Sequence, residues 1–413
     1  MELFDPERLV ALLKEQLGPK TGVPEETQEA VKLAYLLSSQ TDEGRSLRLA
    51  FLIAWEGVTF GLEQRFEQPI TGPEAIRRLC LAADPDDACL RIARHEGSVA
   101  AVGITARPSL GMPLAGFPSD VLIESRDSGS IRVEMPRASA RYERGHHYVP
   151  NGASVLSELL PSAILEAVRS HCVTPRGNTL HFGEGVQVYD TELLPAHEDE
   201  FRQAAEEATR DVIPAALVYL LEQIRRGRHG GALILCPSAI DKFRDRFVTY
   251  NALEPAGGPT RPVQGWNAPL LAYATEIAHL LLVNKGIILI PDLAEELGPK
   301  PDEIVNKMRS IRIPQLDRRF AQFARMWARL TSVDGILVFD RLLAPRLFGA
   351  FVGLPSDKSH IDEVIGKKGA RHRSMAFAVS HVNNSLGLVV SQDGAITALK
   401  GTEGHVESHE VLL

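Results

Sequence analysis

Apolar residues recur at helical spacing in two segments near the amino terminus. In DPERLVALLKEQL (5–17) and TQEAVKLAYLLSS (27–39) they return every three or four positions, which places them on one face of a helix. Asp5 followed by Pro6 is a typical helix start. The pattern therefore predicts that residues 1 to 60 are mainly helical.

The pattern changes to strands and turns between about residues 88 and 149. GSVAAVGITA (97–106) and SDVLIESRDSGSIRVEMPRASARY (119–142) alternate apolar with polar positions, and RDSG (126–129) has the composition of a hairpin turn. A further helix is predicted over 153–171. Together these segments predict an α+β domain in the amino-terminal half.

A boundary between two domains is expected near residue 200, because residues 173–200 are rich in turn formers and end in an acidic run. We predict an amino-terminal domain over 1–200 and a second domain over 201–413. The second opens with a long helix (199–228) that we expect to kink or restart at Pro214.

Strands and helices alternate along the second domain, which predicts an α/β sheet flanked by helices. Its middle part, about 245–325, is less regular and contains helix candidates at 268–282 and 315–330. The other segments are HGGALILCP (229–237) and DGILVFD (334–340) as strands, FGAFVGLP (348–355) as extended chain, GARHRSMAFAVSHV (369–382) as a turn and helix, and SLGLVVSQDGAITAL (385–399) as a hairpin.

Composition and charge narrow the function classes. The chain has 413 residues and a formal net charge of −8, so the overall balance does not favour nucleic acid as a partner. The longest apolar stretch, 277–293, is interrupted by Asn284 and Lys285 and is shorter than the roughly 20 residues of a membrane span. We therefore expect neither a nucleic-acid nor a membrane partner.

The cysteines lack the spacing of a metal site. None of the four belongs to a CxxC motif, and none recurs with histidines at zinc-ligand intervals. Reduced, mostly buried thiols in a cytoplasmic protein are expected. The four residues are Cys80, Cys89, Cys172 and Cys236.

Two common phosphate-binding motifs are missing. IGKKGA (365–370) fails the P-loop pattern at its first glycine and at its hydroxyl position, and FGEGVQV (182–188) lacks the third glycine of the dinucleotide-binding fingerprint.

A basic block nevertheless precedes an apolar helix in KKGARHRSMAFAVSHV (367–382). Cations at a helix amino terminus are opposed by the helix dipole, so their presence there suggests a bound multivalent anion. The block also fits a solvated basic helix end, a nuclear-localisation-like segment or an RNA-contacting patch.

Four motifs in order resemble the diadenylate cyclase domain family. They are Gly231-Ala232, Asp334-Gly335-Ile336, Gly369-Ala370-Arg371-His372-Arg373 and Val390-Ser391-Gln392-Asp393. The resemblance covers about 205–413, with an insertion at about 245–325. Ala370 stands where the family has threonine, and Ile336 stands where it has alanine.

The resemblance implies a mixed central sheet flanked by helices, and an enzyme that condenses two ATP into cyclic di-AMP and two pyrophosphates with Mg²⁺ or Mn²⁺. It implies a homodimer or higher oligomer with cyclase domains face to face, and an amino-terminal domain that regulates them. Asp334 would hold the metal and orient the 3′-hydroxyl, and Gly335 would let the backbone approach the nucleotide.

The family also implies the roles of the remaining site residues. Arg371, His372 and Arg373 would neutralise the triphosphate, Ser391 would contact a phosphate, and the segment from Phe351 to Leu354 would line the adenine. The other implied nucleotide contacts are Gly231, Ile336, Gly369, Ala370 and Gln392.

An alternative function uses the same fold without catalysis. Because Ala370 lacks a hydroxyl and Ile336 is bulkier than alanine, the domain also fits a regulator that senses ATP or cyclic di-AMP. Structural roles remain open for three residues: Asp334 as a turn aspartate, His372 as a helix-end histidine and Ser391 as part of an ordinary hairpin turn.

Overall fold

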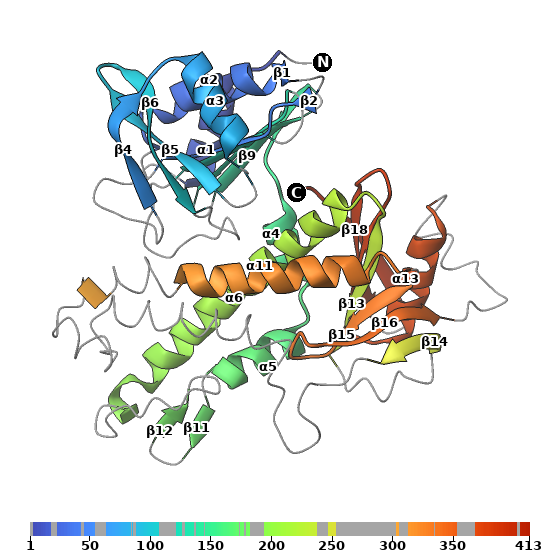
Figure 1. Ribbon diagram of the computed structural model, residues 1–413. Coiled ribbons are helices and arrows are strands. Elements are labelled where there is room, and N and C mark those ends of the chain that lie inside the picture. Colours follow the sequence, from blue (N-terminus) through green and yellow to red (C-terminus); the bar gives the residue numbers. More distant parts are fainter. Residues whose placement is uncertain are drawn as a thin grey trace. The chain divides into compact units, whose positions relative to one another are not determined.

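The computed structural model forms two compact units (Figure 1). The first comprises Met1–Pro150 with Leu289–Asp317, and the second Asn151–Ile288 with Arg318–Leu413. The described residues are 3–17, 23–42, 45–53, 63–83, 85, 88–106, 121–125, 129–135, 138–143, 145–172, 174–176, 179–181, 194–237, 247–252, 303–304, 313–333, 335–352, 368–402 and 405–413.

The first unit contains an eight-stranded mixed sheet in the order β10-β9-β8-β7-β3-β5-β6-β4. Strands β3 and β5 are parallel, and the other neighbours are antiparallel. The strands are β3 (Leu49–Ile53), β4 (Glu63–Ile70), β5 (Ala88–His95), β6 (Ser98–Ala106), β7 (Val121–Ser125), β8 (Ile131–Met135), β9 (Ala138–Glu143) and β10 (His146–Tyr148), and β1 (Thr41–Asp42) pairs with β2 (Arg45–Ser46).

Helices α1 (Pro6–Leu17), α2 (Thr27–Ser38) and α3 (Pro73–Ala82) belong to the first unit. The apolar faces of α1 and α2 join one core with the alternate strand residues Leu49, Phe51 and Ile53. This confirms the two amino-terminal helices and the strand-rich region that follows. β7 and β8 pair as predicted, although residues 126–128 of their turn lie outside the described chain.

The prediction that residues 41–53 are helical is wrong, because they form β1, β2 and β3. Leu49–Ile53 is buried at every position. Phe51 belongs to the core under the helices, whereas Ala50 and Leu52 belong to a separate buried cluster. Because this short run is apolar on both faces, its hydrophobic pattern fits a buried strand and a buried helix equally well. Pairing with the neighbouring strands determines its conformation.

The second unit contains a seven-stranded mixed sheet in the order β14-β16-β15-β13-β17-β18-β19. Strands β13 and β15 are parallel, and the other neighbours are antiparallel. The strands are β13 (Gly231–Leu235), β14 (Phe247–Ala252), β15 (Ile336–Phe339), β16 (Pro345–Val352), β17 (Leu386–Val390), β18 (Ile396–Thr402) and β19 (His405–Val411), and β11 (Thr174–Arg176) pairs with β12 (Thr179–His181).

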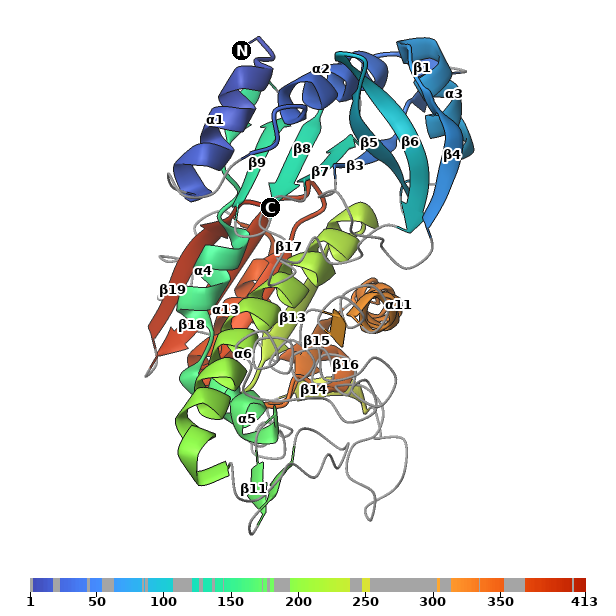
Figure 2. The ribbon, with the colours of Figure 1, turned by 90° about the vertical axis from the view of Figure 1, so that its left-hand side faces the viewer.

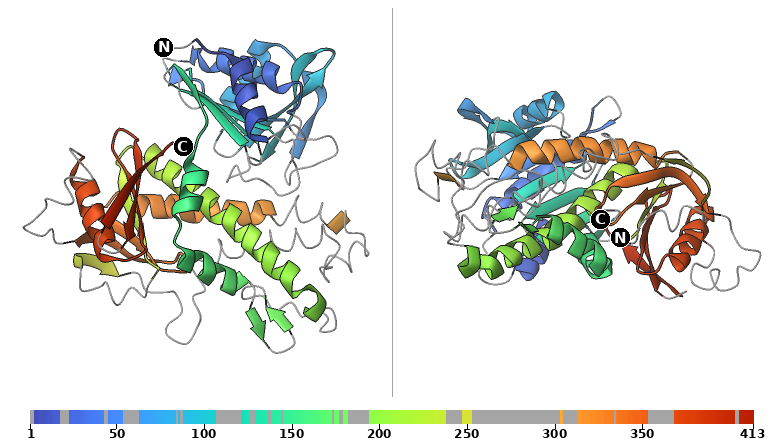
Figure 3. Two further views of the ribbon diagram at one scale, coloured as in Figure 1. Left: turned by 180° about the vertical axis from the view of Figure 1, so that it is seen from behind. Right: turned by 90° about the horizontal axis from the view of Figure 1, so that it is seen from below.

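Helices cover both faces of this second sheet (Figures 2 and 3). Met375 and Val379 of α13 (Ala370–His381) share a core with Ala232 and Val389 on one face. On the other face, α6 (Leu194–Arg226) contacts β17, and Trp327 of α11 (Ile313–Leu330) packs edge-on against Phe339 at 5.5 Å between ring centroids. The protein is therefore a mixed α/β protein with two mixed sheets.

Contacts divide the chain at Pro150, whereas the boundary predicted from the sequence lies near residue 200. Helices α4 (Gly152–Leu159) and α5 (Ser162–Cys172) both contact α6, which places them in the second unit. The predicted helix over 153–171 is two helices, because Leu160 before Pro161 adopts an extended ψ of 128°.

The helix predicted to kink or restart at Pro214 is the single helix α6, and it begins at Leu194, so the acidic run lies within it. Strand β14 forms in the region predicted to be irregular, and α11 confirms the helix predicted over 315–330. The helix candidate at 268–282 lies outside the described residues.

Three cysteines are buried free thiols, as predicted: Cys80, Cys89 and Cys236. Burial raises the pKa of both Cys80 and Cys236 to about 12, so these thiols stay protonated near neutral pH. Among the helices that the structure describes, none has both the length and the apolar character that a bilayer crossing requires.

Candidate functional site

The register of the second sheet brings four distant segments to one edge. Gly231 at the start of β13 lies opposite Val390 at the end of β17. In the parallel pair, Leu233 is level with Leu337, so Ala232 is level with Ile336, the first residue of β15. Because α13 begins near the same edge, segments far apart in the sequence surround one cavity of about 620 Å³.

A row of apolar side chains forms the floor of this cavity. Val389, Ala232, Ile336 and Ala350 line it and come from four adjacent strands. Ala232 pairs with Val389, and Ile336 pairs with Ala350. Phe351, which is 46% exposed, lines the cavity at the end of this row.

The first turn of α13 forms one wall. Gly369, Ala370, Arg371, His372 and Ser374 all line the cavity. Gly369 is the N-cap residue with extended backbone angles, and it makes no side-chain capping bond. Its carbonyl accepts the His372 amide at 3.1 Å, which closes the first turn of the helix. The amino end of a helix therefore borders the cavity, where its dipole favours an anion.

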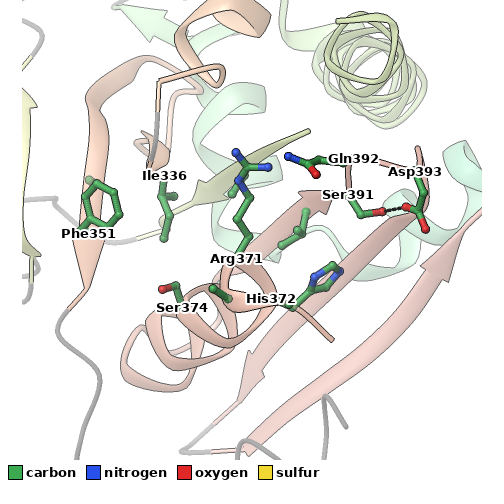
Figure 4. Close-up of a pocket in the computed structure, with 14 residues that line it drawn as sticks. Ile336, Phe351, Arg371, His372, Ser374, Ser391, Gln392 and Asp393 are labelled. Atoms are coloured by element: carbon green, nitrogen blue, oxygen red, sulfur yellow. Dashed lines mark hydrogen bonds between the residues drawn. The ribbon is translucent and has the colours of Figure 1, made fainter. Parts of the chain in front are cut away.

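The turn between β17 and β18 forms the opposite wall with Ser391, Gln392 and Asp393. The Ser391 hydroxyl contacts the Asp393 carboxylate (Figure 4). The Ser391 amide donates to the Ala395 carbonyl at 2.9 Å, and the Ala395 amide donates to Asp393 Oδ1 at 3.3 Å. This turn is thus held by its own hydrogen bonds, and it presents Ser391 and Asp393 at the cavity.

Arg371 brings a permanent positive charge to the apolar cavity. Its Nη1 atom donates a hydrogen bond of 2.9 Å to the His229 carbonyl. In Figure 4 the guanidinium group points toward Gln392. A guanidinium that is oriented by the backbone is well suited to bind phosphate or carboxylate oxygens.

His372 also lines the cavity, but it is only 7% exposed. Its Nε2 lies 3.2 Å from Thr397 Oγ1, and the same oxygen accepts a bond of 3.1 Å from Lys368 Nζ. Burial, followed by the positive charge of Lys368, lowers the pKa of His372 below its ordinary value, while Asp393 acts in the opposite direction. The ring is therefore mainly neutral at pH 7.

No family model matches this chain, and no curated protein matches it. The assignment of the site therefore depends on the residues themselves.

Nine of the sequence-predicted site residues line the same cavity, although they come from separate parts of the chain. They are Gly335, Ile336, Phe351, Gly369, Ala370, Arg371, His372, Ser391 and Gln392. Asp334 and Leu354 lie outside the described residues, so their predicted roles stay predictions.

Gly231 and Arg373 are not among the lining residues. A Cβ atom at Gly231 would lie 2.6 Å from Thr331 Oγ1 and 2.7 Å from Ile224 Cγ2, so this glycine permits close helix packing. Arg373 is two positions after Arg371, or about 200° around the helix, and therefore lies on another side of α13.

Five lining residues are not among the site residues predicted from the sequence: Ala232, Ala350, Ser374, Val389 and Asp393. Asp393 belongs to the Val390–Asp393 motif, and Ser374 follows Ala370 by one helical turn, so both had a detectable signal. The small apolar residues of the floor carry no chemical signal in the sequence.

Proposed function

We propose that the chain is a diadenylate cyclase that condenses two ATP into cyclic di-AMP and two pyrophosphates. The observation that supports this most is that all four motifs that resemble the family contribute residues to one cavity. The first motif contributes Ala232 alone. The first and last of these lining residues, Ala232 and Asp393, are 161 positions apart in the sequence.

The cavity has the two surfaces that a nucleotide requires. The apolar floor and the Phe351 ring suit a purine base, because flat apolar surfaces bury the faces of an aromatic ring. The Arg371 guanidinium and the amino end of α13 suit the phosphates. Neutral His372 would donate or accept a hydrogen bond at this site.

The product requires a second copy of the cavity. Each ribose 3′-hydroxyl gives up its proton as its oxygen forms a bond to the α-phosphorus of the other nucleotide. Each α–β phosphate bond breaks, and the proton leaves with the released pyrophosphate. One cavity orients one ATP, so a homodimer or higher oligomer with facing cavities completes the ring. The first unit would then regulate how the cavities face each other.

The expected metal is Mg²⁺ or Mn²⁺. Within the described residues there is no group of three or more histidine, cysteine or acidic side chains that would hold a metal alone. Mg²⁺ commonly binds through one or two carboxylates and substrate phosphates, and Asp393 provides one carboxylate at the cavity. Asp334 is proposed as the second ligand. The metal would neutralise charge on the leaving pyrophosphate.

A nucleotide-sensing regulator is the second candidate. Ala370 provides no hydroxyl at the cavity, and the full side chain of Ile336 forms part of the floor. Both features reduce the polar contacts and the space for a reacting nucleotide, and neither prevents binding. On this alternative the chain would bind ATP or cyclic di-AMP without turnover.

Mass spectrometry of the purified protein incubated with ATP and Mg²⁺ or Mn²⁺ tests the proposal. We expect cyclic di-AMP from the wild type, and none from Asp334→Asn, which should keep ATP binding because the amide preserves the side-chain shape. ATP binding without product would favour the regulator. Absence of binding to both ATP and cyclic di-AMP would contradict both functions.

A further inference from the structure

Ser374 extends the wall of the cavity beyond the basic block. It lies four positions after Ala370 on α13, so both residues lie on one face of the helix, and both line the cavity. Figure 4 draws Ser374 on the side of the cavity where Ile336 lies, whereas the Arg371 guanidinium points toward Gln392.

The Ser374 hydroxyl differs from the other serine hydroxyl of this helix. Ser380 donates to the Phe377 carbonyl at 2.8 Å, which is the usual bond of a helical serine to its own backbone. Nearby Ser385 donates to the Val382 carbonyl at 2.6 Å. For Ser374, no hydrogen bond is formed with any group in the described part of the chain. Its hydroxyl keeps both its donor and its acceptor capacity for a ligand.

We infer that the Ser374 hydroxyl binds a ribose hydroxyl of the nucleotide, an inference that rests on the proposed function. The base is assigned to the apolar floor near Ile336 and Phe351, and the phosphates are assigned to Arg371. The ribose joins these two parts of a nucleotide, and therefore lies between them. A neutral hydroxyl that donates and accepts matches a sugar hydroxyl, whereas a phosphate is better matched by the guanidinium.

This contact would make Ser374 a determinant of specificity for ribonucleotides. Removal of one neutral hydrogen bond typically costs about fivefold in affinity. We therefore expect Ser374→Ala to bind ATP about fivefold more weakly than the wild type. Its affinity for the deoxynucleotide that lacks the contacted hydroxyl should equal that of the wild type, because that contact is already absent.

The test is calorimetric titration of the full chain with ATP, 2′-deoxy-ATP and 3′-deoxy-ATP. Ser380→Ala is the matched control, since its hydroxyl bonds within the same helix and not at the cavity. Circular dichroism melting curves would verify that each variant is folded. The expected result is that one of the two deoxynucleotides binds Ser374→Ala and the wild type with equal affinity.

Two results would overturn the inference: unchanged ATP affinity in Ser374→Ala, or an equal loss of affinity for all three nucleotides. A wild type that does not bind ATP would overturn this inference together with the nucleotide assignment. A wild type that binds ATP without forming cyclic di-AMP would contradict the cyclase alone, and the same three affinities would still decide the role of Ser374.

Discussion

Arg371 Nη1 donates a hydrogen bond of 2.9 Å to the backbone carbonyl of His229, although the two residues are 142 positions apart. The bond connects the first turn of α13 to the chain that enters β13. Between them, Gly230 adopts a φ of +65°, and a Cβ atom there would lie 2.7 Å from Arg371 Nη1. The direction of the guanidinium therefore depends on a backbone conformation that favours glycine.

Gly230→Ala is expected to displace Arg371 and to weaken ATP binding by about tenfold, the loss typical of a charge-assisted hydrogen bond. Gly97→Ala is the matched control, because Gly97 has a φ of +81° but no atom within 4 Å of the position that a Cβ would occupy. Both variants place alanine at a positive φ, and only Gly230→Ala, whose Cβ would also lie 2.8 Å from the Val390 carbonyl oxygen, should lose affinity in calorimetry. Equal affinities would show that Arg371 does not depend on this contact.

Alanine substitutions of Arg371 and Arg373 are expected to have very different effects on ATP affinity. Arg371→Ala should weaken ATP by about 1.5–3 kcal/mol and adenosine much less, because the lost contacts are to phosphate. Arg373→Ala should leave both affinities nearly unchanged, since Arg373 does not line the cavity. Titrations with ATP and adenosine measure both effects. A larger loss of ATP affinity from Arg373→Ala than from Arg371→Ala would contradict the placement of the phosphates beside Arg371.

His372 should make stability depend on pH. Its pKa is lowered from 6.5 in the fold, so the unfolded chain binds more protons than the folded protein between the two pKa values. The contribution of the neutral ring to the free energy of unfolding is therefore complete above pH 6.5, and it decreases as the pH falls below this value. Chemical denaturation at about pH 7.5 and about pH 5.5 should show a larger loss for the wild type than for His372→Gln.

Lys368→Met provides the check on this mechanism. Removing the Lys368 charge should raise the pKa of His372 toward its ordinary value, because that charge is the second cause of the shift. An NMR titration of the His372 ring measures this directly. Identical pH dependence in the wild type and His372→Gln would show that another group controls acid stability.

Gly335 is expected to be essential for the shape of the cavity. It has a φ of +119°, and a Cβ atom there would lie 2.7 Å from Gly349 Cα and 2.8 Å from the Ala350 nitrogen. Gly335→Ala should therefore cost more than about 2 kcal/mol of stability. Gly369→Ala should cost at most about 1 kcal/mol, because Gly369 has ordinary backbone angles and open space around it. Urea denaturation of both variants tests the contrast.

Local periodicity was enough to predict much of the second unit. The apolar run of β13, the turn and helix at Gly369–His381 and the β17–β18 hairpin agree with the structure. The cluster of Arg371 and His372 at the start of the helix was also predictable, since charge and spacing are properties of one short segment. These features depend on interactions within a few residues of the chain.

The structure alone determined which of these residues share a cavity. Gly231 and Arg373 belong to the same motifs as lining residues, yet one faces packed helix residues and the other lies about 200° from Arg371 around α13. The side of a helix or strand that faces a cavity is set by strand register and by contacts between distant segments. The bond from Arg371 to His229 is such a contact, and no local pattern in either segment predicts it.

The amino acid sequence by itself determined where α1, α2 and α13 form, because the spacing of apolar side chains along one helix decides which face is buried. Only the tertiary structure decided that Leu49–Ile53 is a strand and that Ser374 joins the cavity. Leu49–Ile53 is apolar on both faces, so its parallel and antiparallel partners decide its conformation. Ser374 acquires its role because α13 packs against the sheet whose register brings Ile336 and Ala232 to the same floor.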